Sequence, residues 1–207
     1  AGLHIDQYPY YDYASHSIRF EEMLACLGNI KAGDVVMLHG CCHNPCGADL
    51  SQEQWRQIRN IALQQGFTVF IDLAYQGLGD GLEEDVYGAR LLAESLPELI
   101  VVTSCSKNFG LYRERTGAMT LVTDSNATTA IATTQIAAAA RAMYSMPPDH
   151  GAAVVQLILN DPALRSEWDE ELSTMRGRIN GLRAQLVKQF KAASIDEDFS
   201  FIKREKG

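Results

Sequence analysis

Residues 34–107 alternate short apolar runs with helix-forming segments, and this alternation most constrains the fold. Three apolar runs and two helical segments follow one another, at 34–39, 51–65, 67–73, 83–96 and 99–103. The first helical segment opens on a capping box of Ser51 and Gln54 and stops before Gly66, a favoured helix C-cap. Strands that alternate with helices through short connections form a largely parallel sheet with right-handed crossovers. The nearly continuous apolar run 34–39 predicts a strand buried on both faces.

The second half of the chain is dominated by helical patterns. We predict a strand, three helices and a final short strand, at 116–123, 126–144, 150–159, 161–192 and 199–202. Asp161 followed by Pro162 is an N-cap with proline at the first helical position. A helix of about 30 residues is long for a globular domain. We therefore expect the helix 161–192 to connect two domains.

Composition narrows the classes of partner. The chain has 207 residues, enough for one large domain, with 26 acidic and 18 basic side chains and a net charge of −8. A negative surface repels nucleic acid and anionic lipid, and no apolar run approaches the ~18 residues of a spanning helix. Five cysteines without a secretory signal do not indicate a disulfide framework. We expect a cytoplasmic protein with neither nucleic acid nor membrane as a partner.

Two further motifs are weighed and set aside. Cys41 to Cys46 is rich in cysteine and includes His43, but no second Cys/His pair follows at zinc-like spacing, so we expect buried thiols and no metal. The glycine-rich segment 77–81 superficially resembles a dinucleotide loop. It has Leu82 where the third glycine should be, and its acidic neighbours would repel a pyrophosphate.

Polar side chains gather where the three parallel strands should end. Ligands bind beyond the carboxyl ends of such strands. The side chains that the three strands bring there are His39, Cys42, His43, Asn44, Asp72, Tyr75, Ser104, Ser106 and Lys107. Lys107, beside small hydroxyl residues, suggests a nucleophilic amine of the kind that forms imines. An imine-forming lysine also suits an aldolase. A carboxylate, an amide and a phenol opposite it favour a bound pyridine ring with a protonated nitrogen, for which Asp72 is the candidate partner.

Four segments carry a resemblance to a known family, and they occur in that family's order. They are 39–47 (HGCCHNPCG), 72–77 (DLAYQG), 104–117 (SCSKNFGLYRERTG) and 141–148 (RAMYSMPP). With these motifs the chain resembles the class I aspartate/aromatic amino acid aminotransferases, which are pyridoxal 5'-phosphate (PLP) enzymes of fold type I. The resemblance extends across essentially all 207 residues. It implies an α/β fold with a largely parallel sheet flanked by helices.

The resemblance also implies roles at the cofactor. Lys107 would form the Schiff base with PLP and later carry a proton at the substrate α-carbon. Asp72 would pair with the ring nitrogen and Tyr75 with the ring oxygen. Asn44 would bind the same oxygen and help position the substrate α-carboxylate. His39 would contact Asp72 on the side away from the cofactor and hold it in place.

Phosphate and substrate contacts follow from the same motifs. Ser104 and Arg115 match the family's phosphate ligands, and arginine suits a phosphate because its contact is forked and charge-assisted. Arg141 aligns with the arginine that crosses the dimer interface to the distal carboxylate of a dicarboxylate substrate. Two departures are Cys46, where threonine is usual, and Cys105, where an aromatic residue is usual.

The resemblance implies transamination between an aspartate-like or aromatic L-amino acid and a 2-oxo acid, by a homodimer in the full-length protein. It places a PLP-binding large domain at 1–174 and the beginning of a smaller α+β domain at 175–207. The family's phosphate-cradling helix, stacking aromatic residue and α-carboxylate arginine have no counterpart in these residues. A catalytically incompetent fragment is therefore one alternative, and another fold type I PLP enzyme, a decarboxylase or lyase, is the second.

Overall fold

A four-stranded sheet forms the centre of the computed structural model, which describes residues 2–206. Its strands are β3 (Val35–His39), β4 (Thr68–Leu73), β5 (Leu99–Ser104) and β6 (Gly117–Val122). They lie side by side in chain order; β3, β4 and β5 are parallel, and β6 is antiparallel to β5. The predicted α/β architecture with a largely parallel sheet is confirmed.

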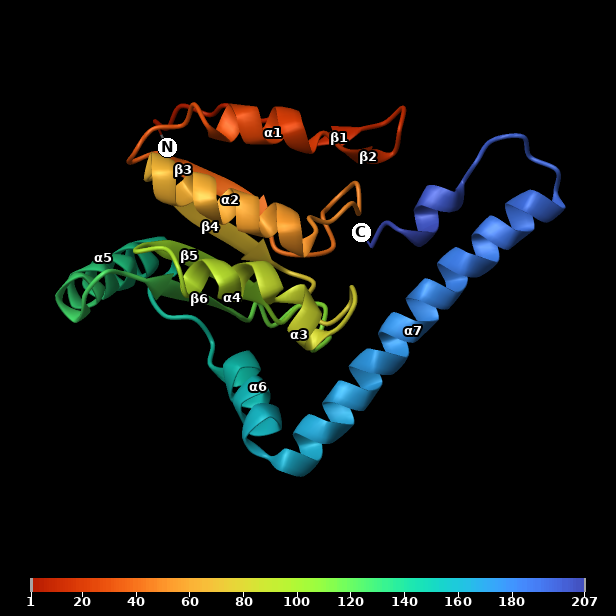
Figure 1. Cartoon of the computed structure of the whole chain (residues 1–207). Coiled ribbons are helices and arrows are strands. Elements are labelled where there is room, and N and C mark those ends of the chain that lie inside the picture. The colour runs from red at the N-terminus through yellow and green to blue at the C-terminus, as the bar shows by residue number, and fades with distance from the viewer. Residues whose placement is uncertain (1, 207) are drawn as a thin grey trace.

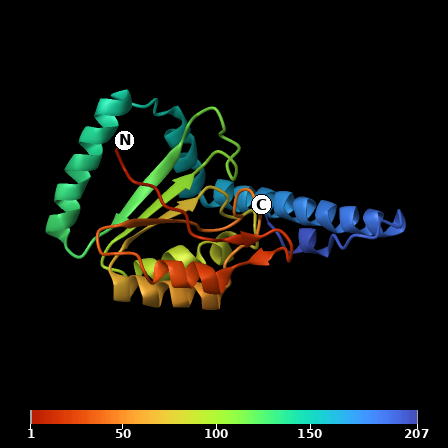
Figure 2. The same cartoon turned by 90° about the horizontal axis from the view of Figure 1, so that it is seen from above.

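Helices cover one face of this sheet. The connecting helices are α2 (Gln52–Gln65), α3 (Leu82–Asp85) and α4 (Tyr87–Ala93), preceded by α1 (Phe20–Leu27). Successive right-handed crossovers that step in one direction across a sheet put their helices on the same side. Figure 2 shows α1, α2 and α4 together below the strands. Their apolar side chains join Val36, Leu38, Val69 and Ile71 in the main core.

The other face of β3 stays open. Val36 and Leu38 are buried against the helices, whereas Val35 and Met37 are 60% and 58% exposed. Successive side chains of a strand point to opposite faces, so this alternation describes a strand covered on one side. The prediction that this strand is buried on both faces is therefore wrong for the described part of the chain.

Helix signals close in sequence behave as expected in α2. The Ser51 hydroxyl accepts the Gln54 amide at 3.2 Å, the Gln54 side chain accepts the Ser51 amide at 2.8 Å, and Gly66 takes a φ of 74°.

The single helix predicted at 83–96 is wrong, because α3 and α4 meet at Val86 and α4 ends at Ala93. The Asp85 carboxylate is turned into the preceding loop, which anchors α3 separately from α4.

Three helices follow the sheet: α5 (Asn126–Tyr144), α6 (His150–Asn160) and α7 (Pro162–Ala192). Asp161 caps α7 by accepting the amides of Ala163 and Leu164 at 2.8 and 3.1 Å, as its motif predicts. Figure 1 shows α7 as a long rod that leaves the sheet. Within residues 2–206, no helix is both long and apolar enough to cross a membrane.

The end of the chain differs from its predicted form. Residues 199–202 were predicted as a strand, and this is wrong: Ser200–Lys203 is a 3-10 helix, η1. The Asp198 side chain accepts the Ser200 amide at 2.9 Å and favours this tight turn. Phe201 then stacks on His16 in a small N-terminal hairpin of β1 (Tyr11–Asp12) and β2 (Ser17–Ile18), with ring centroids 3.5 Å apart.

Candidate active site

The carboxyl ends of β3, β4 and β5 meet at one edge of the sheet. His39 ends β3, Ser104 ends β5, and Asp72 is the second-last residue of β4. His39 and Asp72 are paired in register on neighbouring strands. Both alternate with side chains that face the helices, so they lie on the open face of the sheet.

Two loops bring an amine and a phenol together at this edge. Tyr75 follows β4 and Lys107 follows β5. The Lys107 Nζ atom lies 4.7 Å from the centroid of the Tyr75 ring, a distance typical of a cation–π contact. The structure thus places Lys107 next to Tyr75, the phenol that we named as a candidate from the sequence.

The polar groups of this cluster have no partners of their own. Among residues 2–206, the Asp72 carboxylate, the Tyr75 hydroxyl and the Asn44 amide make no hydrogen bond or ion pair, and Lys107 contacts only the ring of Tyr75. Asp72, Tyr75 and Lys107 are half-buried and Asn44 is exposed. Their polar atoms are reachable by solvent and are not occupied within the described residues, so this set is available to a ligand.

An aromatic stack lies beneath the loop that follows β3. His39 contacts His43 with ring centroids 4.3 Å apart, and His43 stacks on Tyr10 at 4.2 Å. Burial, with the neighbouring His39, lowers the pKa of His43 to about 4, so its ring is neutral at pH 7. No hydrogen bond joins His39 to Asp72 in the described structure, and the supporting role of His39 stays a prediction.

Asp49 holds the turn that carries Asn44. Its carboxylate accepts the amides of Cys42 at 2.8 Å and His43 at 2.9 Å, and the Asn44–Pro45 peptide bond is cis. Desolvation by burial raises the pKa of Asp49. Sequence reasoning missed this residue; an acid shortly after the Asn-Pro turn was the available signal.

Asp85 plays the same part for the glycine-rich loop. Its carboxylate accepts the amides of Gly77 at 2.8 Å, Gly79 at 3.0 Å and Asp80 at 2.8 Å. A Cβ atom at Gly79 would lie 2.6 Å from this carboxylate, which explains the glycine. The amides that a dinucleotide phosphate would need are therefore already bound within the chain. The acidic run that we interpreted as repelling a phosphate and as the first turn of a helix includes this structural ligand.

The Lys107 loop is braced from two sides. The Asn108 side chain donates to the Gln76 carbonyl at 3.2 Å, and the Asn108 carbonyl accepts the Trp168 indole N–H at 2.8 Å. Phe109 stacks on Trp168 with centroids 4.5 Å apart. Sequence reasoning did not select Asn108 or Trp168, because the contact joins segments 60 residues apart.

The predicted phosphate ligands lie near the junction of β5 and β6. Ser104 pairs in register with Gly117, where a Cβ atom would lie 2.4 Å from the Thr103 carbonyl oxygen, and its hydroxyl accepts the Ser106 amide at 3.2 Å. Arg115 precedes this pair by two residues, with a φ of 53° and a bond from its guanidinium to the Tyr112 carbonyl at 3.0 Å. Its side chain is exposed and has no carboxylate partner in the described residues.

Arg141 stands apart from the cluster. It lies on α5, which follows β6, and β6 runs back to the opposite edge of the sheet. Its guanidinium is exposed and, in the part of the chain that the structure describes, has neither a hydrogen bond nor an ion pair. The structure of this one chain does not bring Arg141 to Lys107.

Comparison with known proteins places this geometry in a family. The sequence profile of the family described as "Aminotransferase class I and II" matches residues 1–207. The chain belongs to this aminotransferase family. It is 46% identical over 207 residues to an aspartate aminotransferase of Escherichia coli (strain K12), with all of this chain and 52% of that protein covered. An aromatic-amino-acid aminotransferase of Paracoccus denitrificans is 45% identical over 206 residues, at the same coverage of each chain.

Solved structures agree with this assignment. The aromatic-amino-acid aminotransferase of Burkholderia pseudomallei, described as covalently bound to pyridoxal phosphate, superimposes with a TM-score of 0.97 at 42% identity, over all of this chain and 52% of that one. The predicted family and the fold type I class are confirmed for this aminotransferase chain. It spans about half the length of the curated relatives it matches.

Proposed function

We propose that this chain carries the cofactor centre of a PLP-dependent aminotransferase, with Lys107 as the residue that binds PLP covalently. The observation that carries the proposal is the group of unpartnered side chains at the sheet edge, with the Lys107 amine 4.7 Å from the Tyr75 ring centroid. The relatives support it, because aminotransferases dominate their names and one solved neighbour holds pyridoxal phosphate covalently.

The donor set fits this cofactor. Asp72 offers a carboxylate for a protonated ring nitrogen, and Tyr75 and Asn44 offer a hydroxyl and an amide for the ring oxygen. Lys107 offers an amine for the aldehyde carbon. Ser104 offers a hydroxyl and Arg115 an exposed guanidinium for the phosphate, to which arginine binds in a forked geometry.

PLP, when bound, supplies an electron sink for charge that develops at the substrate α-carbon. Asp72 keeps positive charge on the ring nitrogen, because the negative carboxylate favours the protonated form. Tyr75 and Asn44 stabilise negative charge on the ring oxygen by donating hydrogen bonds to it. The Lys107 amine would hold the proton that leaves the substrate α-carbon.

Arg141 is proposed to act from a second copy of the chain. Its unpaired guanidinium suits the distal carboxylate of an aspartate-like substrate, with Asn44 at the α-carboxylate. Because Arg141 lies apart from its own chain's cluster, this role requires a homodimer. The substrates would be an aspartate-like or aromatic L-amino acid and a 2-oxo acid, since the relatives bear both names.

Covalent trapping tests the lysine directly. The chain is mixed with PLP, reduced with borohydride and mapped by peptide mass spectrometry. We expect the label at Lys107, a pH-dependent imine absorbance band before reduction, and loss of both in Lys107→Ala. Lys31→Ala, which removes an exposed lysine remote from the sheet edge, should keep both. Labelling spread over all lysines, or unchanged in Lys107→Ala, would overturn the proposal.

A second candidate is a chain that binds the cofactor but does not transaminate alone. It is favoured by the coverage of only about half of each relative. A transamination assay of the 207-residue chain beside a longer form of the protein separates the two; equal activity refutes this candidate. In the same assay, release of carbon dioxide without 2-oxo acid would indicate a decarboxylase instead.

A further inference from the structure

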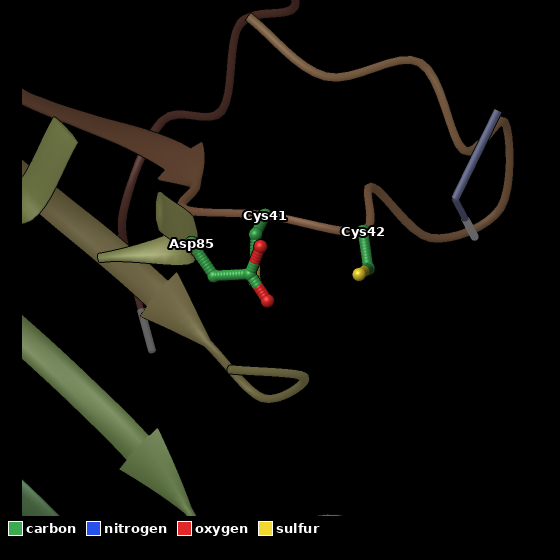
Figure 3. Close-up of side chains that lie close together, drawn as sticks. All are labelled: Cys41, Cys42 and Asp85. Atoms are coloured by element: carbon green, nitrogen blue, oxygen red, sulfur yellow. The ribbon is translucent and has the colours of Figure 1, made fainter. Parts of the chain in front are cut away.

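The adjacent thiols of Cys41 and Cys42 have no part in the proposed function. They follow β3 and are 4% and 2% exposed. The sulfur atoms and a carboxylate oxygen of Asp85 all lie within 4.8 Å of one another. Figure 3 shows the two cysteines next to each other on the segment after β3, with Asp85 reaching them from a separate segment.

Asp85 is a poor third ligand. Its two oxygens already accept the amides of Gly77, Gly79 and Asp80, which hold the neighbouring loop. An ion that drew on this carboxylate would weaken those bonds. Zinc in proteins takes four ligands in tetrahedral geometry, and this cluster offers two sulfur atoms. The site therefore suits a sulfur-binding atom that needs only two sulfur ligands and already carries its third substituent.

The surroundings also disfavour charged sulfur. The hydrogen bond between the two thiols, burial, and the carboxylates of Asp85 and Asp49 raise the pKa of Cys41. The Cys41 thiol is thus held in the protonated state at neutral pH. A reagent that yields an uncharged product is favoured in such a place, because an unpaired buried charge is costly.

We propose that Cys41 and Cys42 form a binding site for trivalent arsenic compounds that carry one organic group. Each sulfur forms one bond to arsenic, and the arsenic–oxygen bonds of the reagent break. The oxygen leaves as water with the two thiol protons, so no oxidation or reduction takes place. Arsenic ends with two sulfur ligands and its own carbon substituent, and the product is neutral.

Intact-mass spectrometry of the native 207-residue chain with phenylarsine oxide tests this site. We expect one phenylarsenic group per chain, with loss of two protons, forming slowly because both thiols are buried. 2,3-Dimercaptopropanol should remove it, and a monothiol at the same thiol concentration should not, since only a dithiol competes as a chelate. The chain with Cys26→Ser, Cys46→Ser and Cys105→Ser, which keeps only the adjacent pair, should form the same adduct.

Loss-of-site variants complete the test. Cys41→Ser and Cys42→Ser should each abolish the dithiol-sensitive adduct, with circular dichroism to confirm folding. Failure of the three-serine variant to form the adduct in its folded state would overturn the proposal, as would an unchanged adduct in Cys41→Ser. Stoichiometric zinc binding that Asp85→Asn abolishes would instead show a three-ligand metal site and overturn the two-sulfur assignment.

Discussion

The central unit 35–104 and the helices of 126–192 differ in how far their apolar side chains are buried. The central unit supplies twelve of the fifteen buried residues of the main core, and α1 supplies the other three, Phe20, Met23 and Leu27. α5 has no buried residue, and α7 buries only Leu172 and Val187. Ile131 and Met143 on α5 are 65% and 74% exposed. Clustered apolar exposure marks surfaces that bind another surface. The first region is therefore stabilised mainly by contacts within its own core and with α1, whereas the second exposes apolar side chains that could contact another surface.

The largest expected effect comes from shortening one isoleucine in each region. Ile71→Ala empties a fully buried site in β4 and should lower the free energy of unfolding by about 2–5 kcal/mol. Ile131→Ala, an identical change on α5, should cost less than about 0.5 kcal/mol, because the side chain is already in water. Urea titration measures both. Equal losses of unfolding free energy in the two variants would show that the two regions are not buried to different extents.

A pH titration should find the next effect in the central unit. The pKa of His43 is about 4 in the folded chain, below its ordinary 6.5, so the unfolded chain binds a proton first as pH falls. The contribution of His43 to stability should be constant above pH 6.5 and fall as the pH drops from 6.5 to 4, by about 1–2 kcal/mol once solvent screening of the half-buried ring is allowed for.

Fluorescence of Trp55, which is buried in α2, reports the unfolding of this unit in a Trp168→Phe background. His43→Gln should flatten the slope between pH 4 and 6.5. His4→Gln, an exposed control, should leave it as it is. If the slope of stability against pH were the same in His43→Gln, other groups would be responsible for the pH dependence.

The smallest expected effect comes from removing the serine that caps one helix in each region. Ser51 caps α2 and Ser125 caps α5, and each hydroxyl accepts the amide three residues later, at 3.2 and 3.1 Å. Ser51→Ala should cost about 1 kcal/mol of global stability. Ser125→Ala should leave the midpoint of Trp55 unfolding unchanged and speed amide hydrogen exchange in the first turn of α5, because α5 lies outside the core. A global loss in Ser125→Ala would show that α5 unfolds together with the sheet.

Local signals made much of this structure predictable. The capping box of Ser51, the C-cap at Gly66 and the cap at Asp161 depend on residues a few positions apart, and each forms as its motif predicts. The order of strands and helices then fixes the sheet topology and brings Asp72, Tyr75 and Lys107 to one edge.

Contacts between distant segments were not predictable in the same way. The open face of Val35 depends on what the rest of the chain leaves uncovered. The turn at Ser200 is a different kind of miss: its Asp198 cap is local, but the apolar run 199–202 favoured an extended segment. Asp85 looked like one acid among three, and only the folded loop shows that it binds backbone amides. Trp168 reaches the Lys107 loop across 60 positions, with no sequence pattern to announce the pairing.

That indole contact gives α7 a mechanical meaning. Trp168 pins the helix to the carbonyl beside Lys107 near the start of a 31-residue rod. From Trp168 to Ala192 the helix extends about 36 Å at 1.5 Å per residue. Leu172 is fully buried and the Arg176 guanidinium donates to the Gly77 carbonyl at 2.7 Å, so α7 is fastened at several points to the loops that follow β4 and β5. One continuous helix thus couples the positions of these two loops, and a displacement of its first half would move both together.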